Sequence, residues 1–161
     1  MTHRTSIRDK IVDTLKTELT DSNQDTYYTD IDMNVSGENL YLDQVEYFPA
    51  LTVALGPERP EYQPGGFRWM YLTLVIRAYV KSEDRADEEL ELLIQDIKTF
   101  IDTHEDIEYT ITTPKGVQKQ LHATEMTILS INTDEGVLNP MGIGEVAIEI
   151  RYQDRNVRFI K

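Results

Sequence analysis

The sequence predicts a protein of the α/β (α+β) class, folded as a single domain over residues 1–161. Two stretches repeat apolar residues at helical spacing, and several others alternate apolar and polar residues as strands do. They occur in the order helix, strands, helix, strands. The chain is long enough for one substantial core, with 40% hydrophobic residues, and has no internal repeat or linker.

The first predicted element is a helix over residues 7–19. Ser6 and Asp9 resemble a capping box at its start. Residues 27–35 then alternate apolar and polar side chains, which predicts a half-buried strand. The apolar positions of the helix are Ile7, Ile11, Val12, Leu15 and Leu19.

Two further strands are predicted before the middle of the chain. Residues 39–47 suggest a short strand or hairpin arm, and residues 48–55 form a nearly continuous apolar strand with Pro49 at its start. Residues 56–66 are rich in proline and glycine, so we expect neither helix nor paired strand there. A hairpin would need a shorter connection, and long loops tend to carry function.

Residues 67–81 predict one long strand with an unusual second face. The even positions, such as Leu72 and Leu74, form a buried face, but the odd positions Phe67, Trp69 and Tyr71 are aromatic where a wet face should be polar. Two explanations are open. A helix of the same chain covers this face, or both helices pack on the other face and leave this one to neighbouring molecules.

The second half of the chain begins with an acidic amphipathic helix over residues 82–102, capped by Ser82 or Asp84. Strands follow at residues 107–112 and 121–132. Residues 133–144 form a second long Gly/Pro loop with apolar tips, and the last strand runs from Val146 to Tyr152.

The charge of the chain is strongly negative and uneven. The formal net charge is −13. This charge argues against nucleic-acid binding, because contacts to phosphate groups need clustered Lys and Arg. Between Ser82 and Glu108 eleven acidic residues face only Arg85 and Lys98. Most of the acidity therefore belongs to the predicted second helix and its exit.

Several classes of site have no support in the sequence. Cysteine is absent, so thiolate chemistry is excluded and a reducing cytosol fits best. We expect no secretory signal or membrane span. Asp30, Asp32 and Asn34 open a calcium-loop pattern, but Val35 and Tyr41 replace its Gly and Glu. No nucleotide or hydrolase motif occurs, so we expect no metal, no cofactor and no enzymatic activity.

The succession of elements resembles the tail terminator, or tail completion, proteins of long-tailed bacteriophages (siphophages), the lambda U-like family. An N-terminal helix and a strand are followed by FPALTVALGPE, a Pro/Gly loop, and a long strand ending in IRAYV that enters KSEDRADEELELLIQDIKTFID. The resemblance covers residues 6–111. It implies a mixed, mostly antiparallel sheet flanked by two α-helices, and no enzyme activity.

The resemblance also implies a function and partners. Family members form a hexameric ring that caps the tail tube, stops polymerisation at the set length and gives the head-completion or connector protein a docking surface. Phage DNA passes through the ring without specific binding. The protein would be at the head-proximal end of the virion tail, and in the host cytoplasm during assembly.

We expect interface roles for aromatic strand residues and for both loops, because aromatic residues, Met and Arg concentrate at interface cores. Part of the acidic helix lines a ring lumen or its rim, where it would repel DNA phosphates, or else it faces outward for solubility. The interface candidates are Glu58, Arg59, Tyr62, Gln63, Phe67, Trp69, Tyr71, Val137, Leu138 and Met141. The acidic candidates are Glu83, Asp84, Asp87, Glu88, Glu89 and Glu91.

Other functions are possible. An acidic DNA mimic could block a nucleic-acid-binding enzyme, but its acids should be spaced along an elongated surface. Another neck or tail connector protein could share the same build. A hydrolase without a recognisable motif would need a pocket with convergent polar groups.

Overall fold

The computed structural model describes residues 2–20 and 25–155. It contains one six-stranded sheet with the strand order β1-β2-β3-β6-β5-β4. All paired strands are antiparallel except β1 and β2. The elements are α1 (His3–Glu18), β1 (Val35–Ser36), the short 3-10 helix η2 (Leu42–Gln44), β2 (Ala50–Gln63), β3 (Phe67–Lys81), α2 (Ala86–Thr103), β4 (Ile107–Thr112), β5 (Gln118–Thr133) and β6 (Met141–Arg155).

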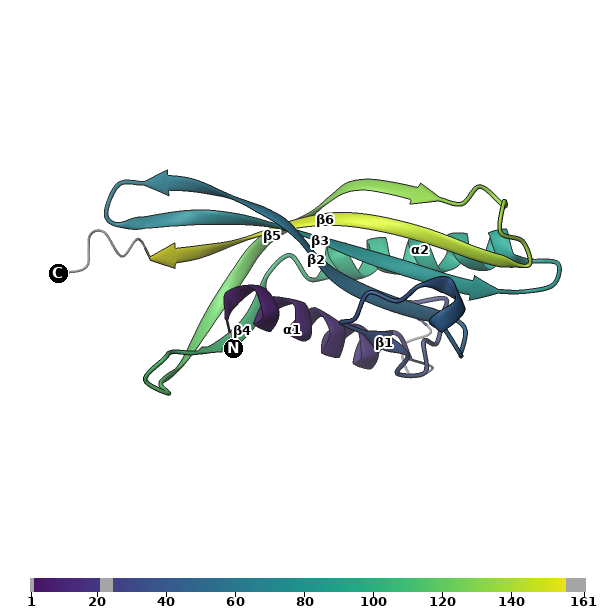
Figure 1. Cartoon of the computed structure of the whole chain (residues 1–161), viewed down its shortest axis with the longest axis horizontal. Coiled ribbons are helices and arrows are strands. Elements are labelled where there is room, and N and C mark those ends of the chain that lie inside the picture. The colour runs from purple at the N-terminus through teal and green to yellow at the C-terminus, as the bar shows by residue number, and fades with distance from the viewer. Residues whose placement is uncertain (1, 21–24, 156–161) are drawn as a thin grey trace.

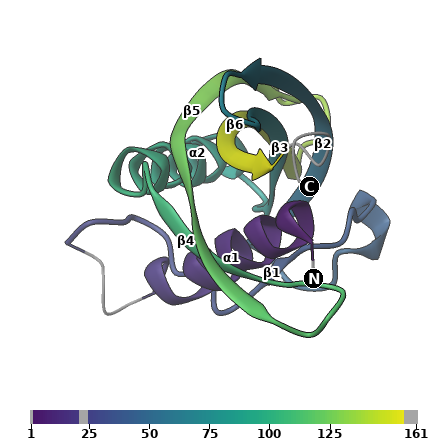
Figure 2. The ribbon, with the colours of Figure 1, turned by 90° about the vertical axis from the view of Figure 1, so that its left-hand side faces the viewer.

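Both long helices lie on the same side of the sheet (Figure 1), which curls around them (Figure 2). The fold class and the mostly antiparallel sheet with two helices are thereby confirmed. α2 approaches β6 closely: a Cβ added at Gly144 would lie 3.0 Å from the side chain of Ile94. The core under the sheet includes Ile7, Ile11, Leu15, Leu72, Leu74, Ile76, Leu93, Ile97, Phe100, Val146, Ile148 and Ile150, all essentially inaccessible to solvent.

The centre of the sheet is the pair of strands β3 and β6. They are hydrogen-bonded in register over their whole length, from Phe67 opposite Arg155 to Lys81 opposite Met141. The bounds of β3 and of β4 are the predicted ones. The predicted strands within β5 and β6 are confirmed, but both strands are longer than predicted.

The prediction of a loop over residues 56–66 is wrong for residues 56–63, and only residues 64–66 form a turn. β2 continues to Gln63 and pairs with the start of β3. A shift of register between Leu55 and Glu58 marks a β-bulge, and β1 pairs with β2 only at residues 51–52, so no described strand lies on the outer side of this part of β2. Proline lacks the N–H of a central strand but is tolerated at an edge or bulge.

The predicted strand over residues 27–35 is also wrong, apart from Val35. Asp32 and Met33 have positive φ angles of 50° and 62° and turn the chain. The preceding residues are held against α2, because both carboxylate oxygens of Asp96 accept backbone N–H groups, from Tyr28 and Thr29, at 2.8 Å. Side-chain anchoring therefore overrides the alternating pattern.

The segment between these regions, residues 39–47, contains η2 and no strand. Its turn is closed locally by the side chain of Gln44, whose Oε1 accepts the N–H of Tyr41 at 2.9 Å. This local hydrogen bond competes with extended pairing. The prediction of a short strand or hairpin arm over residues 39–47 is therefore wrong.

The ends of the helices differ from the prediction in detail. α1 begins at His3, so Ser6 lies inside the helix, and its buried hydroxyl has no hydrogen-bond partner in the described residues. The predicted capping box is wrong. α2 begins after Arg85, whose N–H is 3.3 Å from the hydroxyl of Ser82. The second predicted loop is shorter, because β6 already begins at Met141.

Candidate docking surfaces

The sheet face opposite the helices, the open face, carries the predicted aromatic residues. Both helices lie on the other side of the sheet (Figure 1), and Phe67, Trp69 and Tyr71 are only partly buried. Phe67 meets Trp69 edge-on at 5.8 Å between ring centroids. The guanidinium groups of Arg59 and Arg151 lie 4.1 Å and 4.0 Å from the ring centres of Tyr71 and Trp69. Along this part of β3 both helices therefore pack on the other face, and no helix in the described part of the chain covers the aromatic side.

The far end of the same face is covered by the chain itself. The hydroxyl of Tyr79 donates to the carbonyl of Leu40 at 2.6 Å, and Arg77 donates to the side chain of Asn39. Segment 39–42 therefore closes this end. The uncovered part of the open face is restricted to the region of Phe67, Trp69 and Tyr71 and the centre of the sheet.

Charge on the open face is locally balanced. Three of its arginines each form an ion pair with a glutamate, whereas Arg155, opposite Phe67, is exposed. The pairs join Arg59 to Glu149 at 3.7 Å, Arg77 to Glu145 at 2.6 Å and Arg151 to Glu125 at 3.1 Å. A surface of aromatic rings and paired arginines can approach another protein surface without a large electrostatic penalty.

One end of the molecule is a projecting hairpin arm, which we define as residues 56–63, 67–72 and 150–155. It extends beyond both helices (Figure 1). Of the predicted interface residues on it, Arg59 joins the aromatic group on the open face. Tyr62 is exposed on the opposite side, 5.8 Å from the guanidinium of Arg68, and Gln63 donates to Glu61 at 2.9 Å.

Glu58 has a different environment from the other candidates on the hairpin arm. Its carboxylate accepts the hydroxyl of Tyr152 at 2.9 Å and lies 3.9 Å from Nε of Arg4. Both partners belong to this chain, and the side chain of Glu58 is mostly buried. The arrangement ties Glu58 to the interior of the molecule.

The opposite end, the loop end, consists of residues 31–34, 46–49, 82–85 and 134–140. These segments are adjacent: the N–H of Ser82, for example, donates to the carbonyl of Pro140 at 2.9 Å. Val137 is 82% exposed, and Leu138 and Met141 are less so. Asp134 holds the tip in shape, because its two carboxylate oxygens accept the N–H groups of Leu138 and Ile143 at 3.0 Å and 3.3 Å.

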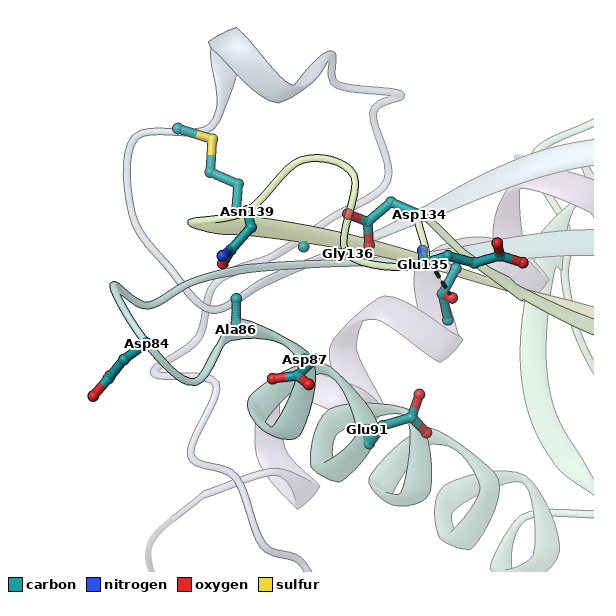
Figure 3. Close-up of a pocket in the computed structure, with 11 residues that line it drawn as sticks. Asp84, Ala86, Asp87, Glu91, Asp134, Glu135, Gly136 and Asn139 are labelled. Carbon is teal, nitrogen blue, oxygen red and sulfur yellow. Dashed lines mark hydrogen bonds between the residues drawn. The ribbon is translucent and has the colours of Figure 1, made fainter.

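An acidic cavity of about 440 Å³ lies between the start of α2 and the β5–β6 loop. Figure 3 shows Asp87 and Glu91 on the helix below it, and Asp134 and Glu135 on the loop above. Asp84 completes five carboxylates, and no basic residue lines the cavity. The fold thus joins part of the predicted acidic set to the second predicted loop.

The remaining predicted acids, Glu83, Glu88 and Glu89, are exposed outside this cavity. Glu88 pairs with Arg85 at 3.1 Å, and Glu88 and Glu89, like Asp87, lie in the first turn of α2. Negative side chains there also stabilise the helix through its dipole. Asp134 and Glu135 were missed because a loop pattern does not reveal which element the loop faces.

The loop end also exposes apolar residues that sequence reasoning missed. Met33 is 58% exposed, and with Tyr47 and Lys81 it lines a second surface cavity. The alternating pattern assigned Met33 to a buried face, and only its positive φ angle turns it outward. Tyr47 stood in a predicted strand, where its exposure could not be foreseen.

The histidines lie in three separate environments. His104 is 3.2 Å from Glu18, and His122 is 3.1 Å from Asp106. His3 is partly buried, and burial lowers its pKa, although nearby Asp154 and Glu58 act in the opposite direction. Within residues 2–20 and 25–155, no three His, Asp or Glu side chains are placed to hold a metal ion. No helix in that part of the chain could cross a membrane.

The chain matches one family of known proteins over its whole length. All 161 residues match the family described as Bacteriophage Tail Tube Terminator Protein. The chain is similar to the tail tube terminator protein p142 of Escherichia phage T5, with 40% identity over 153 residues and 95% of each chain covered. A chain from the virion of a native gene transfer agent particle is similar with a TM-score of 0.44 and 11% identity, over 75% of this chain and 79% of that one.

Proposed function

Because the chain belongs to the bacteriophage tail tube terminator family, we propose that it caps the tail tube as a hexameric ring, stops polymerisation at the set length and offers the surface for head–tail joining. Its partners are then further copies of itself, the tail-tube protein and a head-completion or connector protein. The ring occupies the head-proximal end of the tail and is assembled in the host cytoplasm.

The observation that carries this proposal is the contrast between the two ends of the molecule. A cap must bind the tube on one side and present a different surface on the other. The hairpin arm is aromatic with paired charges, whereas the loop end carries five carboxylates around one cavity and an exposed apolar tip at Val137. Two unlike surfaces at opposite ends of one subunit are what a ring with two unlike faces requires.

The open face, which continues onto the arm, is assigned to contacts between subunits or between rings. Trp69 and Tyr71 lie under arginine side chains, so they are already ordered in the single chain. Aromatic and arginine side chains that are ordered before binding lose less conformational entropy on association. An interface at this face would also bury aromatic surface that the chain itself leaves partly exposed.

The acidic residues contribute to the lumen of the ring or its rim, where they let DNA pass without binding it. The test is a virion assembled with Glu88→Gln, Glu89→Gln and Glu91→Gln together, compared with one carrying the conservative changes to Asp. We expect slower DNA delivery from the Gln variant only. Unchanged delivery would assign these side chains to an outward, solubilising face.

The oligomeric state provides the direct test of the cap. We would measure the purified chain by native mass spectrometry, alone and with tail-tube protein, and image the mixture by negative-stain electron microscopy. Six-fold rings, free or at one end of each tube, are expected. Monomers in both samples, with the tubes left uncapped in the mixture, would overturn the proposal and favour an acidic inhibitor.

A substitution separates the open face from the rest of the surface. Trp69→Ala should reduce the fraction of rings or capped tubes, whereas Tyr28→Ala should not. Tyr28 is an exposed aromatic residue outside the open face, the hairpin arm and the loop end. Equal ring formation by the two variants would show that the open face is not an interface.

A further inference from the structure

We propose that the first turn of α1 is a clamp that sets the direction of the hairpin arm, with Arg4 and His3 as its positioning residues. The inference concerns the single chain. Only its consequence for capping rests on the proposed function.

The hairpin arm leaves the body of the molecule at an irregular point. The register between β2 and β3 shifts between Leu55 and Glu58, and bulges of this kind bend and twist a strand. Gly56 lies in the bulge, and a Cβ there would be 2.8 Å from the carbonyl oxygen of Thr73, so only glycine fits. The base of the arm therefore combines an irregular outer strand, β2, with the regular pair β3 and β6, and contacts at the bulge can act on the direction of the arm.

Arg4 supplies the first contact at this bend. Its guanidinium donates to the carbonyl of Gly56, inside the bulge, and its Nε lies 3.9 Å from the carboxylate of Glu58. That carboxylate also accepts the hydroxyl of Tyr152 on β6. One side chain of α1 thus connects the bulge of β2 to the neighbouring strands.

His3 supplies the second contact, to the β6 side of the arm. Its ring stacks on Tyr152, with centroids 4.7 Å apart and planes at 15°. Its Nδ1 is 2.8 Å from the hydroxyl of Tyr109, and its Nε2 is 3.9 Å from Asp154. Asp154 in turn accepts two hydrogen bonds from Arg68 on β3, at 2.8 Å and 3.1 Å.

These contacts reach β2 and β6 directly from one turn of one helix, and they reach β3 through Asp154 and Arg68. They are polar and directional, unlike the apolar contacts between α2 and β6. Among the described residues, the buried Nε of Arg4 has no hydrogen-bond partner, which is costly for a polar group.

Because the chain has no cysteine, the direction of the arm can be measured with two introduced labels. Glu61→Cys on the arm and Lys10→Cys on α1 are both exposed positions for spin labels. The distance distribution between them should be narrow in the otherwise unchanged chain and clearly broader with Arg4→Met. Arg8→Met is the matched control, since Arg8 is on the same helix and pairs with its neighbour Asp9.

Glu58→Gln, which keeps the side-chain shape and removes its charge, should broaden the distribution as well. It also provides a second variant if Arg4→Met does not fold. Equal distributions in both variants and in the control would overturn the clamp. Tube capping is then assayed separately. We expect variants with a broadened distance distribution to lose capping. A broadened distribution with normal capping would still support the clamp but would show that the arm is not part of the capping surface.

Discussion

The hairpin arm and the loop end are built by different physical means. The loop end is attached through apolar packing, because α2 buries Leu90 and Ile94 against a strand that carries Gly142 and Gly144 at the contact. The base of the arm is also apolar, at Leu72 and Ile150, but hydrogen bonds, ion pairs and ring stacking to α1 are added there. Apolar substitutions at the loop end and polar substitutions at the arm should therefore have different effects.

The largest expected effect is at the apolar attachment. Leu93 is inaccessible to solvent, and Leu93→Ala should lower the free energy of unfolding by about 2–5 kcal/mol, because it leaves a cavity between α2 and the sheet. Leu92→Ala, at the adjacent 39% exposed position, is the control and should cost far less. Chemical denaturation measures both. Equal losses would mean that α2 is not what holds the loop end.

The next effect concerns the buried carboxylate that anchors residues 28–29. Asp96→Ala leaves the N–H groups of Tyr28 and Thr29 without an acceptor, which should cost roughly 1–3 kcal/mol. Burial raises the pKa of Asp96, so part of this loss is offset by removing a buried charge. Hydrogen exchange should show faster exchange at Tyr28 and Thr29, and unchanged exchange there would contradict the anchor.

At the arm, the expected effect depends on pH. Burial lowers the pKa of His3 below its ordinary value of 6.5, so the unfolded chain binds the proton more tightly than the folded one. Stability should therefore fall as the pH drops below about 6.5, and it should be full above that value. Chemical denaturation between pH 7 and pH 5 gives the free energy of unfolding as a function of pH, and its slope should be smaller for His3→Gln than for the unchanged chain. Identical slopes would show that His3 does not cause the pH dependence.

The smallest expected effect on stability is on the open face. Arg59→Ala removes a cation–π contact with Tyr71, worth about 0.5–1 kcal/mol at an exposed site. Arg85→Ala, which removes an exposed ion pair without an aromatic partner, is the comparison. Thermal unfolding should barely separate the two variants. A loss of ring formation confined to Arg59→Ala would sharpen the contrast between an interface role and a role in folding.

How much could be predicted from sequence depended on whether local pattern and tertiary contacts agreed. β3 was predicted with its bounds because it alternates, lacks Gly and Pro, and lies in the middle of the sheet. The arm part of β2 was missed, since Pro57 and Pro60 normally break strands and only the free edge of β2 permits them. The strand predicted over residues 27–34 does not form, because the distant carboxylate of Asp96 holds the backbone of Tyr28 and Thr29 in another conformation.

The candidate docking residues divide in the same way. The aromatic side of β3 could be predicted from the sequence, because aromatic residues at its odd-numbered positions do not fit a solvent-exposed strand face, which should be polar. The inward direction of Glu58 was not visible, since it depends on a bulge that shifts the register of β2. The exposure of Met33 was hidden for a similar reason, because it arises from a positive φ angle at a non-glycine residue.

The pairing of β3 and β6 has a mechanical consequence. Their fifteen-residue strands run side by side from the arm to the loop end. Hydrogen bonds in an antiparallel pair lie across the strands, so a pull along the long axis strains the whole row in shear at once. A pull that peels β1 and β2 from the edge breaks bonds one after another. The molecule should therefore bear tension between its two ends far better than tension across them.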